Sequence, residues 1–202
     1  MQKAAKKKSA VGGNKPSEKA VKDILARLRQ QGASAVKLIP VSGIVIDERV
    51  RLKCQIPLCD SYHKNLMCPP HVPSVAFFRE ALSRYAGAML IQVTSPLPDA
   101  TTDPSSADVY APAKKLHDLV NLAEKWAFEY QFRFATGLIG GCCRLCDECV
   151  ALHNGRFCRH PFRARPSMEA MGIDVVDTVN HAGLPTRFPI ANEVTWTGVV
   201  LI

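Results

Sequence analysis

Hydrophobic and polar residues follow two different periods along this chain, and these periods divide it into helices and strands. Apolar residues at every third or fourth position predict amphipathic helices over residues 18–32, 72–87, 113–132 and 173–183, with a shorter helical stretch between Pro166 and Gly172. Runs rich in β-branched or continuously apolar residues predict strands over residues 35–47, 88–95, 133–141 and 193–202. Because strands and helices alternate, the sequence predicts a single α/β (or α+β) domain with helices packed on a sheet of about four strands.

Particular residues indicate where the helices begin and end and which faces they bury. Ser74 and Asp174 are expected N-caps, and Gly32, Gly87 and Gly183 are expected stops. The predicted buried face of the second helix consists of Phe77, Phe78, Leu82 and Tyr85. The predicted buried face of the third helix consists of Leu116, Leu119, Val120, Ala123, Ala127 and Tyr130. We expect Met168 and Met171 in the core.

The net charge of +8 is unevenly distributed. Nine Lys and Arg residues against two acidic ones lie in residues 1–30, so the rest of the chain is nearly neutral. We interpret residues 1–20 as a disordered basic tail before a domain of residues 21–202, and we expect no specific nucleic-acid binding. No run of residues has the length and apolarity of a membrane span, and the basic N-terminus lacks the apolar region of an export signal. These features predict a soluble, cytoplasmic protein.

One further segment without periodicity is residues 95–112, which are rich in Pro, Ser and Asp. A connection of that length inside a domain is often a lid or a partner surface.

The eight cysteines indicate metal binding or catalysis. Thiols in the cytoplasm stay reduced, and they are more often metal ligands or catalytic groups than disulfides. Cys143, Cys146 and Cys149 are spaced Cys-x2-Cys-x2-Cys, and Cys158 follows after eight intervening residues. This triple can direct three sulfurs to neighbouring corners of one iron–sulfur cluster, as in bacterial ferredoxins. Structural zinc more often uses two separated Cys-x2-Cys pairs. The spacing therefore favours a cluster over zinc.

A looser set of cysteines precedes it in the sequence "KCQIPLCDSYHKNLMCPPH", which holds Cys54, Cys59 and Cys68. Three thiolates can hold a metal with an open position, hold a cluster with one labile iron, or recruit a ligand from elsewhere. The spacing does not match the Cys-x3-Cys-x2-Cys pattern of radical S-adenosylmethionine enzymes. Both cysteine regions follow predicted strand ends, where open sheets commonly place functional loops, so we expect them to meet.

The segments "RLKCQIPLC", "CPPH" and "CRLCDECVALHNGRFCRHPFRARPSMEAMGIDV" resemble a family of predicted metal-binding proteins of unknown function, domain of unknown function 2284. The resemblance extends from about residue 36 to the end. It implies metal binding without an established reaction. The family's cysteines correspond to Cys54, Cys59, Cys68, Cys143, Cys146, Cys149 and Cys158.

The remaining cysteine, Cys142, departs from the family pattern. It either supplies an eighth ligand or is a small, partly buried thiol beside a ligand, and the second interpretation is favoured. With seven ligands, one of two four-ligand sites would be incomplete and open to substrate, water or a partner's ligand.

Other residues near the cysteines have both a functional and a structural interpretation. For His160, and with the same caution for His63 and His71, a supporting role beside a metal site is favoured over ligation. Clustered arginines either offset the charge of a thiolate-bound cluster and dock an acidic partner, or form a solvated surface; they are Arg144, Arg156, Arg159, Arg163 and Arg165. Glu169 and Asp174 are acid–base candidates, and capping is preferred for Asp174.

We therefore expect a metal-binding protein with one or two iron–sulfur clusters, of the 4Fe-4S type, in an electron-transfer or redox-support role with a redox protein partner. The cofactor-binding residues are Cys143, Cys146, Cys149 and Cys158 for one cluster and Cys54, Cys59 and Cys68 for the second site. One alternative is a zinc-stabilised interaction module. Another is an enzyme that acts at an open iron of the three-cysteine site. The sequence shows no acid–base pair that would identify a reaction.

Overall fold

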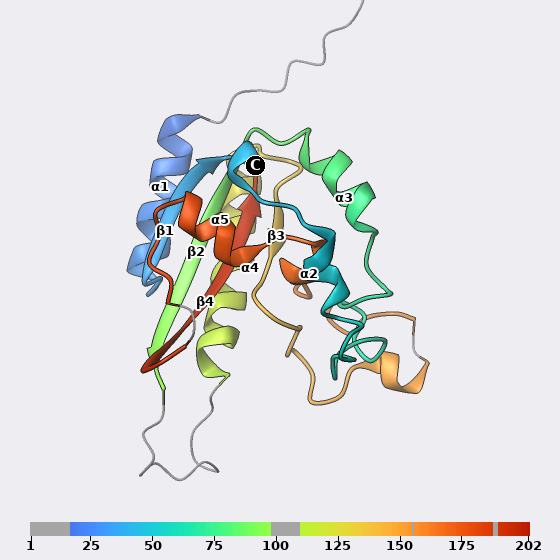
Figure 1. Ribbon diagram of the computed structural model, residues 1–202. Coiled ribbons are helices and arrows are strands. Elements are labelled where there is room, and N and C mark those ends of the chain that lie inside the picture. Colours follow the sequence, from blue (N-terminus) through green and yellow to red (C-terminus); the bar gives the residue numbers. More distant parts are fainter. Residues whose placement is uncertain (1–16, 98–109, 155, 188–189) are drawn as a thin grey trace, which may run out of the picture.

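Helices cover both faces of a four-stranded sheet in this computed structural model, which describes residues 17–97, 110–154, 156–187 and 190–202 (Figure 1). The strands are β1 (Ala35–Pro40), β2 (Gly87–Pro96), β3 (Thr136–Leu138) and β4 (Glu193–Leu201). The α-helices are α1 (Glu18–Gln30), α2 (Glu48–Leu52), α3 (Val75–Leu82), α4 (Ala111–Glu129) and α5 (Val175–His181). Short 3-10 turns are η1 (Val41–Gly43), η2 (Val150–His153) and η3 (Glu169–Met171). The predicted α/β fold class is confirmed.

The sheet has the strand order β1-β2-β4-β3, and every neighbouring pair is antiparallel. The two central strands are the long ones, and β2 is buried from Gly87 through Val93. A strand buried on both faces reads as a continuous apolar run rather than an alternating one, which is the pattern of "GAMLIQV". The short β3 pairs only with the last residues of β4, from Val199 to Leu201.

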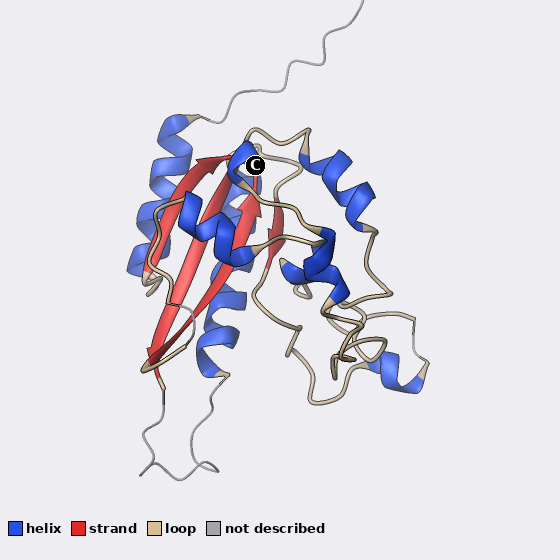
Figure 2. Cartoon of the chain, in the orientation of Figure 1, coloured by secondary structure: helices blue, strands red, loops and turns tan. Residues whose placement is uncertain are grey.

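Alternate residues of the central strands contribute to two separate hydrophobic clusters, because successive strand side chains point to opposite faces. Met89 and Ile91 join the cluster that includes the buried faces of α1 and α4. Ala88 and Leu90 join the cluster that includes α3, α5 and η3. Figure 2 shows the resulting layers, with helices in front of and behind the sheet. The buried methionines Met168 and Met171 belong to the second cluster, as expected.

The close approach of α4 to the sheet depends on a glycine. A Cβ atom on Gly198 of β4 would lie 2.8 Å from Val120 Cγ2 and 2.9 Å from the Leu138 carbonyl oxygen. Only a residue without a side chain leaves room for both neighbours. Gly198 therefore sets the depth at which α4 packs over β3 and β4.

Most predicted helix boundaries are confirmed. The Phe77 N–H donates to Ser74 Oγ at the start of α3 (3.2 Å), and the Asp177 N–H donates to Asp174 Oδ1 at the start of α5 (3.0 Å). Gly32 and Gly183, after α1 and α5, have positive φ. These interactions confirm Asp174 as a cap.

Three predictions about the second and third helices are wrong. Phe77 is 63% exposed, because it lies on the outer side of α3, whose buried residues are Val75, Phe78 and Leu82. Tyr130 is 38% exposed and follows the last residue of α4, where its hydroxyl donates to Asp23 Oδ2 (2.7 Å). The helix ends at Leu82, and Gly87 is the first residue of β2 instead of a helix stop.

Two predicted segments lie partly outside the described residues. The first helix begins at Glu18, so residues 18–20 belong to it rather than to a disordered tail; residues 1–16 are not described. Residues 98–109 of the proposed lid or partner segment are likewise outside the description. Within the described ranges, no helix combines the length and apolarity needed to cross a membrane.

Candidate metal centre

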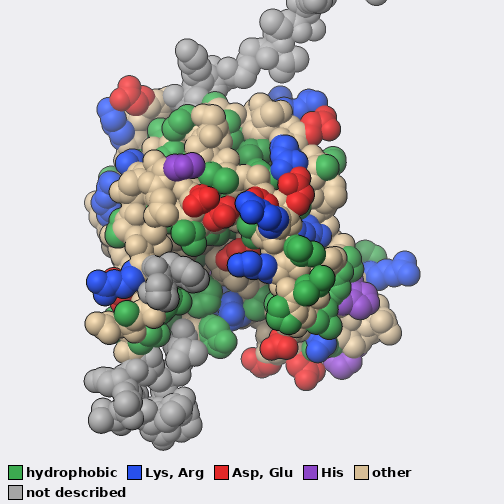
Figure 3. Space-filling model, in the orientation of Figure 1, with side chains coloured by type: hydrophobic (Ala, Val, Ile, Leu, Met, Phe, Trp, Pro, Cys, Tyr) green, Lys and Arg blue, Asp and Glu red, His purple; other side chains and the backbone are tan. Residues whose placement is uncertain are grey.

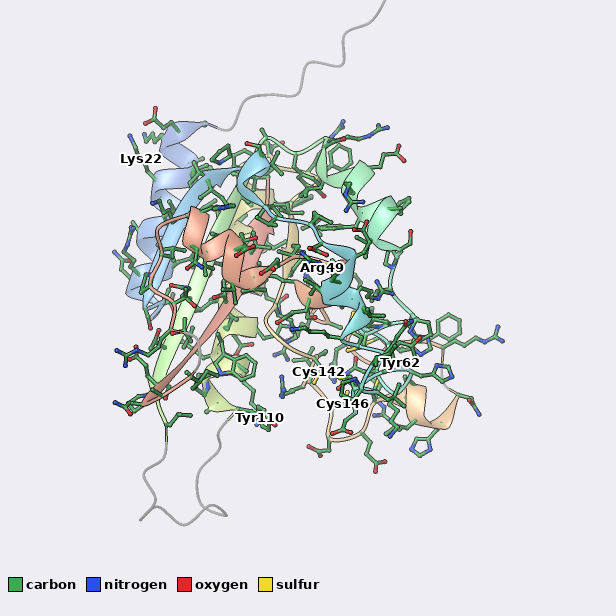
Figure 4. The ribbon with its side chains drawn as sticks, viewed as in Figure 1. Lys22, Arg49, Tyr62, Tyr110, Cys142 and Cys146 are labelled. Atoms are coloured by element: carbon green, nitrogen blue, oxygen red, sulfur yellow. The ribbon has the colours of Figure 1, made fainter. Side chains whose placement is uncertain are left out.

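The two cysteine regions form adjoining loops at one side of the sheet. The first cysteine loop comprises residues 53–74, between α2 and α3, and the second comprises residues 139–168, between β3 and η3. In Figure 4, Tyr62 of the first loop lies in the same part of the molecule as Cys142 and Cys146 of the second. The expectation that the two regions meet is therefore confirmed.

The reason that the loops meet differs from the one inferred from the sequence. Strand ends gather at one edge of a parallel sheet, but β1 and β3 run in opposite directions in this antiparallel sheet. Instead, residues 166–174 run from the end of the second loop to the N-cap of α2, the helix that leads into the first loop. At one end, Ile139 N–H donates to Pro166 O (3.0 Å) and Met168 N–H donates to Ile139 O (2.8 Å). At the other end, Asp47 N–H donates to Gly172 O (2.9 Å).

Two hydrogen bonds link the tips of the loops directly. The side-chain amide of Asn65 donates to the Cys143 carbonyl (2.9 Å), and Leu66 N–H points at Cys149 Sγ (3.5 Å). Asn65 is only 9% exposed, and its own Oδ1 accepts from Met67 N–H (2.9 Å). Sequence analysis did not single out Asn65, since a lone Asn between cysteines carries no spacing signal.

We expect Asn65→Ala to lower stability by about 1–3 kcal/mol, because it leaves the Cys143 carbonyl and the Met67 N–H without the partners they have in a buried site. The thermal unfolding midpoint and the metal content per chain measure the effect. Asn180→Ala, at an exposed position of α5, is the matched control and should leave both unchanged. Equal values for Asn65→Ala and the wild type would show that this bond does not hold the loops together.

One group of thiols forms around Cys68. Burial raises the pKa of the Cys68 thiol to about 12, and nearby thiols act in the same direction, in the order Cys142, Cys59, Cys54 and Cys143. Burial also raises the pKa of Cys54, followed by the effect of Cys59, while Arg51 opposes it. The three cysteines of the first loop are thus electrostatic neighbours of one another, and Cys142 of the second loop is the thiol with the largest effect on Cys68.

A second group of thiols forms around Cys143. Burial raises the pKa of Cys143, the Leu145 N–H lowers it, and nearby thiols raise it in the order Cys158, Cys146 and Cys149. The His160 N–H donates to Cys158 Sγ (3.3 Å). The four cysteines selected by their spacing therefore lie near one another. That they bind metal stays a prediction.

The chemistry of these groups fits a soft metal. Thiolates are the preferred ligands of zinc and of iron–sulfur clusters, and N–H groups directed at sulfur are a recurring feature around bound clusters. Buried thiols with a raised pKa are protonated without metal, so metal binding would release their protons. Within the described part of the chain, no three His, Cys, Asp or Glu side chains converge closely enough to hold a single ion. The thiols are neighbours, and they do not form a closed single-ion cage.

The histidines near the loops contact one another and the backbone. The rings of His63 and His71 stack with centroids 5.2 Å apart, and His71 Nε2 is 3.2 Å from the His63 carbonyl oxygen. Both line a cavity of about 720 Å³ that also reaches Cys158 and Arg156. His160 contacts a thiol through its backbone N–H, and the supporting role of its ring stays a prediction. Whether any of these rings binds metal stays untested.

Several arginines of the second loop have structural partners. Arg165 binds Glu124 of α4 (2.5 Å), Arg163 pairs with Asp118 (3.4 Å), and Arg159 donates to the Glu148 carbonyl (2.9 Å). Arg144 donates to the Cys142 carbonyl (2.9 Å) and lies 4.1 Å above the Tyr110 ring and 5.4 Å from the Trp196 ring. Positive charge therefore lies around the second loop, and part of it anchors that loop to the sheet and to α4.

Glu169 has an environment different from that of a helix cap. The Gly141 N–H donates to Glu169 Oε2 (3.4 Å), and burial is the main cause that raises the pKa of this carboxyl group. Glu169 also lies near enough to Cys54 to raise the pKa of that thiol. Its side chain is thus a partly buried acid between the starts of the two loops.

A family model described as "Predicted metal-binding protein (DUF2284)" matches residues 37–202. The match includes both cysteine loops and all four strands from the third residue of β1 onward. No curated protein and no solved structure matches the chain.

Proposed function

This chain belongs to the DUF2284 family of predicted metal-binding proteins, and from that premise we propose that it binds iron–sulfur clusters in its cysteine loops and transfers electrons to or from a redox partner. The observation that supports this most is the grouping of Cys143 with Cys146, Cys149 and Cys158. Three of these thiols come from the tight triple that suits the corners of a cubane cluster, and the fourth comes from farther along the chain.

The residues around this group would hold and tune a bound cluster. When bound, a cluster supplies one-electron redox chemistry, with a potential set by hydrogen bonds to its sulfurs, nearby charge and solvent exposure. The N–H groups of His160 and Leu66, directed at Cys158 and Cys149, would stabilise negative charge on those sulfurs. Arg144 brings positive charge to the carbonyl of Cys142. Both effects favour the more negative, reduced state and raise the potential.

The exposure of the two cysteine loops at the surface supports an electron-transfer role over a purely structural one. Cys59 is exposed, so the first cysteine loop reaches the surface. Exposed apolar side chains lie on the same two loops, namely Ile56, Leu58, Phe157 and Phe162. Figure 3 shows apolar side chains gathered over this part of the molecule, with acidic and histidine side chains at its edge. An electron partner that covered these side chains would approach the cysteines directly.

The test is purification without oxygen, followed by measurement of iron, acid-labile sulfide and zinc per chain beside the visible spectrum. We expect about four irons and four sulfides for each bound cluster, together with a broad visible absorption that bleaches with dithionite. Cys146→Ser should lose the cluster of the second loop, whereas Ser61→Ala, a conservative change in the first loop, should retain it. Zinc without sulfide, in a colourless protein, would replace this proposal with the zinc-stabilised interaction module.

A further inference from the structure

A further cavity, of about 240 Å³, lies where the first turns of α4 meet the second cysteine loop. It is distinct from the cavity beside Cys158, with which it shares no lining residue. Tyr110, the residue before α4, and Cys142 of the second loop mark the two sides of this junction in Figure 4. Ile139 and Leu145 give the cavity an apolar part of its wall. The rest of the wall is mainly polar and charged.

The charged side chains of this cavity are mostly basic. Lys114, Arg144 and Arg163 line it together with a single acid, Asp118, which leaves two positive charges in excess. A cavity lined mainly by one sign of charge attracts ligands of the opposite sign, because its low-dielectric walls focus the field. A phosphate group attached to an organic molecule carries a charge of about −1.5 to −2 at neutral pH. The excess charge of the cavity therefore matches that of a phosphate group.

Arg144 is held in position by its neighbours. Its Nη1 donates to the Cys142 carbonyl (2.9 Å), and the guanidinium carbon lies 4.1 Å from the centroid of the Tyr110 ring and 5.4 Å from that of Trp196. Glu169 acts on this charge from η3 but does not line the cavity. A guanidinium group has five N–H donors in a planar fork that suits phosphate oxygens. The Cys142 carbonyl occupies one of them, so further donors are available to a ligand.

The second arginine of the cavity, Arg163, has a fixed backbone and a weakly paired side chain. Its carbonyl oxygen accepts from His117 Nε2 (2.8 Å) and from the Asn121 side-chain amide (3.1 Å), both on α4. His117 is only 3% exposed, so water does not compete well for this contact. The guanidinium group is 3.4 Å from Asp118, and both side chains are more than half exposed, where ion pairs contribute little. The Arg163 side chain can therefore exchange this partner for a bound anion at small cost.

We propose that this cavity binds a phosphate group, either free or on a small organic molecule, with Arg144 and Arg163 donating to its oxygens. Lys114 adds to the positive charge, and the apolar wall at Ile139 and Leu145 would contact the organic part of the ligand. The volume exceeds that of several water molecules, so a phosphate group with a short substituent fits. No metal ligand takes part in the binding, so the inference does not depend on the proposed function.

The experiment is calorimetric titration of the full chain, purified without oxygen, with inorganic phosphate and with glycerol 2-phosphate. Potassium chloride keeps the ionic strength constant, and iron, sulfide and zinc are measured in each preparation. We expect saturable binding of at least one ligand to one site per chain, with a millimolar or lower Kd. Tighter binding of glycerol 2-phosphate would identify a phosphorylated molecule as the ligand, and tighter binding of inorganic phosphate would identify free phosphate. Absence of saturable binding of both in the millimolar range would overturn the proposal.

Variants locate the binding in this cavity. Arg144→Gln and Arg163→Gln should each weaken it about 10-fold or more, the loss expected for a hydrogen bond between charged groups. Asp118→Asn should tighten it, because it removes the opposing charge, and a misfolded protein would not bind more tightly. Arg133→Gln, an exposed position beyond the far end of α4, is the matched control and should bind as the wild type does.

Two results would overturn the proposal after saturable binding is found. One is unchanged binding in both Arg144→Gln and Arg163→Gln. The other is equal weakening in Arg133→Gln, which would show a response to net charge alone. Phosphate binding by a wild-type protein that holds zinc without sulfide would contradict the iron–sulfur function and support this site.

Discussion

Replacing Glu124 by alanine is expected to destabilise the protein by about 2–4 kcal/mol, somewhat less than the loss of one partner from a fully buried ion pair. The Glu124 carboxylate accepts two hydrogen bonds from Arg165 (2.9 and 2.5 Å) and a third from the Gly137 N–H (2.5 Å). The side chains of Glu124 and Arg165 are only 22% and 15% exposed, so water replaces these contacts poorly. The variant would leave a guanidinium group and a β3 amide without their main acceptor.

The measurement is the thermal unfolding midpoint, which should fall by roughly 5–15 °C for a chain of this size. Glu129→Ala is the matched control in the same helix. Its carboxylate is 4.0 Å from Lys125 and both side chains are more than half exposed, so the change should stay within about 0.5 kcal/mol. Glu124→Gln, which retains an acceptor for the Gly137 N–H, should fall between the two. Equal midpoints for Glu124→Ala and Glu129→Ala would show that the pair does not anchor the second loop.

Ile139→Ala should cost about 2–5 kcal/mol, the range for truncating a large buried aliphatic side chain. Ile139 is 2% exposed and packs in the cluster between the sheet and α4. It is also the residue whose backbone is bonded to both Pro166 and Met168. The variant would leave a cavity at the point where the chain turns from β3 into the second cysteine loop.

Unfolding of the Ile139→Ala protein should be followed together with its metal content, because a loosened loop root would release metal at lower temperature than the wild type. Ile190→Ala provides the control at a site that is 53% exposed, and its midpoint should match the wild type. A normal midpoint with reduced metal content would mean that Ile139 positions the loop without contributing to the core.

The sequence predicted the elements well because their signals are local. The apolar stripe of α4 and the caps at Ser74 and Asp174 involve residues within four positions of one another. The errors came where an element ends. Tyr130 continues the stripe of α4 in sequence, but the helix has already ended and the ring reaches toward α1.

The arrangement of the candidate centre was only partly predictable. Spacing alone grouped Cys143 with Cys146, Cys149 and Cys158, since those four residues lie in one loop. It left the role of Cys142 open, and it could not show the hydrogen bond to the Cys143 carbonyl from Asn65, which is distant in sequence. Nor could it show that the loops meet through residues 166–174 in an antiparallel sheet, because strand direction is a long-range property.

The two hydrophobic clusters on either side of the sheet bear on how the protein is produced. Their residues come mainly from the strands, from α1, α3, α4 and α5, and from η3, and of the cysteines only Cys143 packs against them, at the margin of one. Small zinc domains, by contrast, fold only when metal binds. A chain with its own core can fold without metal, so we expect metal insertion to be a separate and later step. The cell could then hold a reserve of folded, metal-free protein whose loading depends on metal supply.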